Sequence, residues 1–76
     1  MSDTFHWLDV ERIAEELDEA HPGKDPLSVR FTELRAIVQG LPGFAADPAH
    51  PCNERILETI QMLWHEERTG AERERD

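Results

Sequence analysis

Two proline–glycine pairs constrain the fold of this chain more than any other feature. Pro22-Gly23 and Pro42-Gly43 divide the sequence into three segments. Proline lacks the backbone donor that a helix interior needs, and glycine favours the end of a helix. Within each segment, apolar residues recur at three- and four-residue spacing, which is typical of an amphipathic helix. The sequence therefore predicts three helices joined by irregular connections.

Capping residues set the expected limits of the first two helices. Asp9 is the predicted N-cap of the first helix, which ends by His21. The pair Asp25-Pro26 can open a single helical turn in the following connection. Residues 29–31 are expected to be a short extended piece at most. Thr32 is the predicted N-cap of the second helix, which stops at the second proline–glycine pair.

The third segment contains the longest predicted helix, capped by Asn53 and stopped at Gly70. Around it we expect a disordered lead over residues 1–6, one domain over 7–69 and a polar charged tail over 70–76. The predicted class is mainly α. Its arrangement is a three-helix, helix-turn-helix-like or modified winged-helix fold with at most a short strand or hairpin.

The charge balance limits the classes of partner. The chain has 17 acidic and 8 basic residues, which gives a formal net charge of -9. A nucleic-acid surface needs clustered Lys and Arg to neutralise phosphates. Only Arg30 and Arg35 lie near the second helix, so DNA binding by a helix-turn-helix pair is disfavoured. An anionic membrane surface is disfavoured for the same reason, whereas a basic protein patch or a hard cation is attractive.

The small size of the chain and its lack of catalytic motifs argue against an enzyme. A chain of 76 residues buries only about 60 % of its unfolded surface, so it has little room for an enclosed substrate pocket. No nucleophile–base set or phosphate-binding loop is present.

Cys52 is the single cysteine, and its position before a helix favours a lowered thiol pKa, although a packing role is expected. A single cysteine excludes an intrachain disulfide, so a reducing, cytoplasmic compartment is expected. A monomer is also expected.

The first predicted helix is unusually acidic. Arg12 is the only base between residues 9 and 19, and it can pair with Glu16 one turn later. The carboxylates predicted to share one face are Glu11, Glu15, Asp18 and Glu19. Like charges at this spacing cost a few tenths of a kcal/mol per pair. From the residues alone a solvated helix face is the favoured interpretation, and a functional surface, where such conflicts tend to occur, is the alternative.

Two functions fit this acidic face. Carboxylates one turn apart, such as Glu15 and Glu19, can share a hard cation through oxygen ligands. The candidate ligands of such a weak, exposed metal site are Asp9, Glu11, Glu15, Asp18 and Glu19. Alternatively, the face docks on a basic patch of a partner protein, which gives fast and salt-dependent association.

Several segments resemble the IscX family. They include the stretch from Phe5 to Asp9, the segment Asp25-Pro26-x-x-Val-Arg-Phe-Thr and the segment Asn53-Glu-x-Ile-Leu-Glu. The resemblance spans roughly residues 5–68. It implies an accessory protein of bacterial iron–sulfur cluster assembly that binds iron weakly, with no tightly bound cofactor. It also implies binding to a basic region of a cysteine desulfurase, in competition with a frataxin-like protein.

The resemblance also assigns partner-binding acids and leaves the role of the iron open. The implied contacts with the desulfurase are Asp9, Glu15, Glu16, Glu19, Asp25, Glu33 and Asp47. The family's loop around Phe44 is often strongly acidic, but here only Asp47 remains, so a contact through this loop is disfavoured. Regulation of the desulfurase is the leading hypothesis, and donation of iron to the cluster is the alternative.

Overall fold

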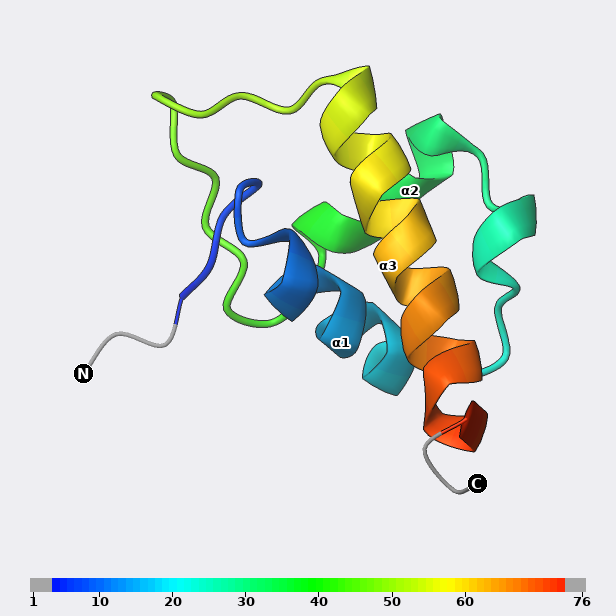
Figure 1. Ribbon diagram of the computed structural model, residues 1–76. Coiled ribbons are helices and arrows are strands. Elements are labelled where there is room, and N and C mark those ends of the chain that lie inside the picture. The colour runs from blue at the N-terminus through cyan, green and yellow to red at the C-terminus, as the bar shows by residue number, and fades with distance from the viewer. Residues whose placement is uncertain (1–3, 74–76) are drawn as a thin grey trace.

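The computed structural model describes residues 4–73 and shows a mainly helical domain (Figure 1). Three α-helices and one short 3-10 helix account for its regular structure. They are α1 (Val10–Ala20), η1 (Pro26–Ser28), α2 (Phe31–Gln39) and α3 (Glu54–Arg73). Within the described range no strand forms, and one isolated parallel bridge joins Phe5 to Phe44. The predicted mainly α class is confirmed.

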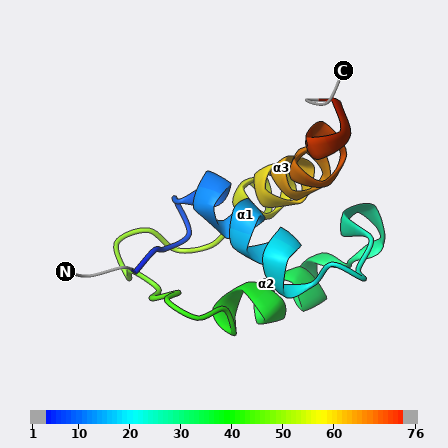
Figure 2. The same ribbon diagram turned by 90° about the horizontal axis from the view of Figure 1, so that it is seen from below.

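Helix α3 is the centre of the packing. It lies beside α1 and contacts both α2 and η1 (Figures 1 and 2). Each helix turns the apolar stripe of its sequence toward this centre, because burial of apolar surface drives the packing. The buried side chains of the core are Phe5, Trp7, Ile13, Ala14, Leu17, Val29, Leu34, Val38, Leu41, Leu57, Ile60 and Trp64. No helix in the part of the chain that is described is both long and apolar enough to cross a membrane.

The segment before α1 belongs to the core, which corrects the disordered lead expected over residues 1–6. Phe5 is only 2 % exposed. Its amide donates to the carbonyl of Gly43 at 3.0 Å, and its carbonyl accepts from the amide of Ala45 at 2.8 Å. Its ring meets that of Phe44 edge-on, with centroids 5.8 Å apart. Gly43 has a φ of 88°, a left-handed conformation that favours glycine. Residues 1–3 lie outside the described residues.

Helix α2 begins at Phe31, before the predicted cap Thr32. The amide of Leu34 already bonds to the carbonyl of Arg30 at 2.7 Å, so Arg30 occupies the N-cap position. The predicted turn at Asp25-Pro26 is confirmed, since a carboxylate oxygen of Asp25 accepts from the amide of Leu27 at 3.1 Å. The extended piece is therefore limited to residues 29–30, between two helical elements.

Helix α3 starts as predicted and ends later than predicted. The side-chain oxygen of Asn53 accepts from the amide of Ile56 at 2.9 Å, which confirms its role as N-cap. The helix continues through Gly70 to Arg73, so the predicted helix stop at Gly70 is wrong. Glycine costs about 1 kcal/mol inside a helix, which the surrounding turns here offset. Residues 74–76 of the predicted tail lie outside the described residues.

Candidate functional site

Three glutamates on α1 form an exposed row that we call the acid row: Glu11, Glu15 and Glu19. They follow one another at four-residue spacing, so each lies one turn above the last on the same side of the helix. Ile13 and Leu17 hold the other side of α1 in the core. None of the three glutamates has a hydrogen bond or an ion pair with a described residue. Their negative charge is thus presented to solvent.

Two other acids of this region have internal partners. Arg12 Nε donates to Glu16 Oε2 at 2.9 Å, as the spacing predicted. Asp9 occupies the N-cap position of α1 but makes no side-chain cap bond to the helix. Instead, its carboxylate accepts from the backbone amide of His6 at 2.9 Å. The predicted side-chain cap at Asp9 is therefore wrong, because the carboxylate of Asp9 bonds to the backbone of the preceding segment instead of the helix.

Asp18 was expected among the acids without a counter-charge, and the structure corrects this expectation. Arg68 of α3 donates from Nε to Asp18 Oδ1 at 3.0 Å. The same guanidinium donates to the carbonyl oxygens of His21 and Lys24, just beyond the end of α1. Arg68 is fifty positions away from Asp18 in sequence. The acid row consequently contains three glutamates rather than four acids.

The remaining predicted partner-binding acids stabilise local structure outside α1. Asp25 caps η1, as described above, and Asp47 accepts from the amide of Ala49 at 3.0 Å. Glu33 forms an ion pair with Lys24 at 2.8 Å. The hydrogen bond and charge of this lysine lower the pKa of the Glu33 carboxyl. None of these three acids lines either of the two hollows beside the acid row.

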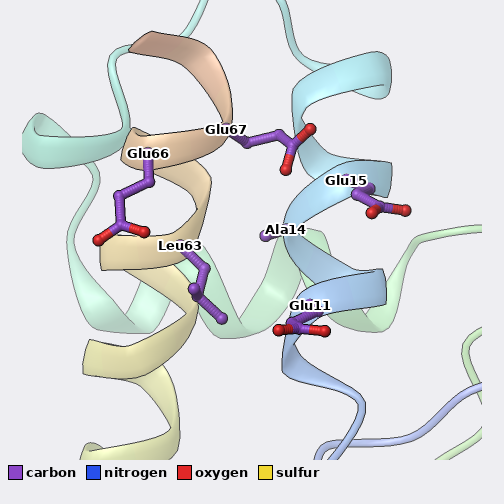
Figure 3. Close-up of a pocket in the computed structure, with 6 residues that line it drawn as sticks. All are labelled: Glu11, Ala14, Glu15, Leu63, Glu66 and Glu67. Carbon is purple, nitrogen blue, oxygen red and sulfur yellow. The ribbon is translucent and has the colours of Figure 1, made fainter. Parts of the chain in front are cut away.

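A groove between α1 and α3 brings a second helix to the acid row. A hollow of about 300 Å³ is lined by Glu11, Ala14, Glu15, Leu63, Glu66 and Glu67. Figure 3 shows Ala14 and Leu63 between the two helices, with the carboxylates of Glu15 and Glu66 pointing away from each other to opposite sides. Glu66 and Glu67 were not among the site residues predicted from the sequence. Only the side-by-side packing of α1 and α3 places these two glutamates beside the acid row. The neighbouring Trp64 was a signal, because its place on the apolar face of α3 indicated which side of that helix meets the core.

This arrangement attracts cations more readily than it holds them in a fixed geometry. Among residues 4–70 no group of three or more His, Cys, Asp or Glu side chains is placed to hold a metal ion. Neighbouring carboxylates such as Glu15 and Glu19 remain available as an open pair.

Cys52 is partly buried, and this burial raises the pKa of its thiol. The lowered pKa suggested by its position before α3 is therefore wrong.

The fold and this surface define a small, acidic, mainly helical protein with an anionic groove. The chain belongs to the iron–sulphur cluster assembly family, whose sequence model matches residues 5–69. This match confirms the resemblance to the IscX family. An uncharacterized protein of Pseudomonas aeruginosa is 48 % identical over 65 residues, which cover 86 % of this chain and 97 % of that protein.

Proposed function

We propose that this protein is a non-enzymatic adaptor that docks on a basic patch of a cysteine desulfurase and regulates it. Membership of the iron–sulphur cluster assembly family supports work within that machinery. In this proposal the protein acts as a cytoplasmic monomer, competes with a frataxin-like protein for the same patch and binds neither nucleic acid nor membrane. Iron binds weakly and reversibly, so that the fraction of protein with bound iron follows the supply of iron.

The acid row is the observation that carries the proposal. Glu11, Glu15 and Glu19 repel one another at a cost of a few tenths of a kcal/mol per pair. No described basic side chain relieves this repulsion. A basic partner would relieve it upon binding and would be attracted from a distance by the net charge of -9. Neighbouring acids such as Asp18 and Glu16 already have arginine partners and contribute less.

A matched pair of double variants tests the docking surface. Glu15→Gln with Glu19→Gln removes two charges from the acid row, and Glu54→Gln with Glu58→Gln removes two exposed charges from the start of α3. Both pairs have four-residue spacing. Titration against purified desulfurase at low salt should show about 2- to 30-fold weaker binding for the first variant. Equal affinities for the two variants, with unchanged helix content, would refute docking through the acid row.

Iron binding is tested on the same proteins. Carboxylate oxygens of Glu11, Glu15 and Glu19 are hard ligands, and the open surface leaves the rest of the coordination sphere to water. Anaerobic titration with ferrous iron should therefore give weak binding that the Glu15→Gln, Glu19→Gln variant weakens further. Iron affinity that is the same in both double variants would place iron elsewhere. Desulfurase inhibition that persists without iron would favour regulation over donation of iron.

A further inference from the structure

The groove between α1 and α3 has a second end, at Leu8, where apolar and charged side chains are mixed. A second hollow of about 380 Å³ is lined by Leu8, Asp9, Val10, Glu11, Arg12 and Leu63. It shares Glu11 and Leu63 with the acidic hollow, so the two hollows adjoin along α1 and are treated together as the groove. Leu8 stands at this end with 49 % of its surface exposed.

We infer that the whole groove, and not only the acid row, receives one amphipathic segment of the protein partner. Resting on the proposed docking function, this inference specifies the ligand: an apolar side chain lies against Leu8 and Leu63, and one or more Lys or Arg side chains follow along the groove. Their aliphatic stems cover Ala14 and Leu63, while their charged heads reach the carboxylates of Glu15 and Glu66.

The dimensions and charges of the groove favour such a segment over a small molecule. Each hollow is close to the lower limit of about 300 Å³ for small-molecule pockets and is open to water. Long side chains need only such a surface depression. Glu11, Glu15 and Glu66 have no counter-charge among the described residues. Basic head groups on the two sides of the groove can therefore each gain a carboxylate neighbour, and the exposed Leu8 at one end sets the direction of the bound segment.

Variants outside the acid row test this inference. Leu8→Ser keeps the charge and removes only the exposed leucine at the second end of the groove, so it should weaken desulfurase binding about four- to tenfold, equally at low and high salt. Leu27→Ser is the control, because Leu27 is also exposed but lies in η1, outside the groove. Leu8→Met should retain binding. Glu66→Gln should weaken binding up to about fivefold at low salt, whereas Glu58→Gln on the same helix should not.

The outcomes separate this inference from the proposed function. Weaker binding for Leu8→Ser and Glu66→Gln, beside unchanged controls, supports an amphipathic segment in the groove. If only the Glu15→Gln, Glu19→Gln variant binds more weakly, docking is purely electrostatic and the groove inference is overturned while the proposed function stands. If the unaltered protein does not bind the desulfurase at all, the proposed function fails and the inference fails with it.

Discussion

Replacement of Arg68 by methionine is expected to destabilise the domain far more than replacement of an exposed arginine on the same helix. Arg68 joins α3 to the end of α1 through Asp18 and through the carbonyl oxygens of His21 and Lys24. Its guanidinium carbon also lies 5.9 Å from the centre of the Trp64 ring. Methionine keeps an unbranched stem of similar length but makes none of these polar contacts.

The expected loss follows from these contacts. The ion pair with Asp18 is about one-third exposed, so it contributes about 0.5–1 kcal/mol. The two carbonyl hydrogen bonds contribute about 1 kcal/mol each and the ring contact about 0.5 kcal/mol. Because the contacts share one side chain, we expect a total loss of about 2–3 kcal/mol. A domain of this length has about 4–11 kcal/mol of stability, so Tm should fall by about 10–20 °C.

Urea unfolding followed by circular dichroism measures this loss. Arg55→Met is the matched control, since Arg55 is exposed on α3 and has no ion pair with a described residue. A double-mutant cycle of Arg68→Met with Asp18→Asn should give a coupling energy of about 0.5–1 kcal/mol. A loss at Arg68 within about 0.5 kcal/mol of the loss at Arg55 would refute a linking role for Arg68.

Three further predictions concern single side chains. Trp64 is fully buried and its Nε1 has no hydrogen-bond partner among the described residues, so Trp64→Phe should cost about 1 kcal/mol or less in a urea titration, against about 3–5 for Trp64→Ala. Asn53→Ala removes the cap of α3 and should cost about 1 kcal/mol, measured as a lower Tm. Lys24→Met should return the depressed pKa of Glu33 toward its ordinary value of 4.5 in an NMR titration. Because the folded pKa of Glu33 is depressed, the stabilisation by this ion pair is present above pH 4.5 and disappears as the pH falls through the folded pKa.

The helices were predicted well from the sequence because helix limits and buried faces depend on residues that are close together along the chain. The proline–glycine pairs and the three- and four-residue spacing of apolar side chains mark where helices can form and which side they bury. The cap at Asn53 and the ion pair between Arg12 and Glu16 also depend only on neighbours within one turn. The start of α2 was misplaced because Arg30, extended after η1, reaches the cap position before Thr32.

The details of the site were less predictable because they depend on tertiary packing. Arg68 neutralises Asp18 from fifty positions away, and no spacing rule within α1 indicates such a partner. The contribution of Glu66 becomes evident only when α3 lies beside α1. Phe5 was assigned to a disordered lead because its partner Phe44 is on a distant connection. The acid row itself was predictable, since α1 alone determines which of its residues share a side.

The packing of α1 on α3 also determines when this chain can fold during its synthesis. Ile13 and Leu17 are made early, but the core that buries them includes Ile60 and Trp64 near the other end of the sequence. Arg68, which joins the two helices, is made later still. An isolated helix as short as α1 is marginal in water. The nascent chain is therefore expected to remain unfolded until residue 68 has been added, and then to fold as one cooperative unit.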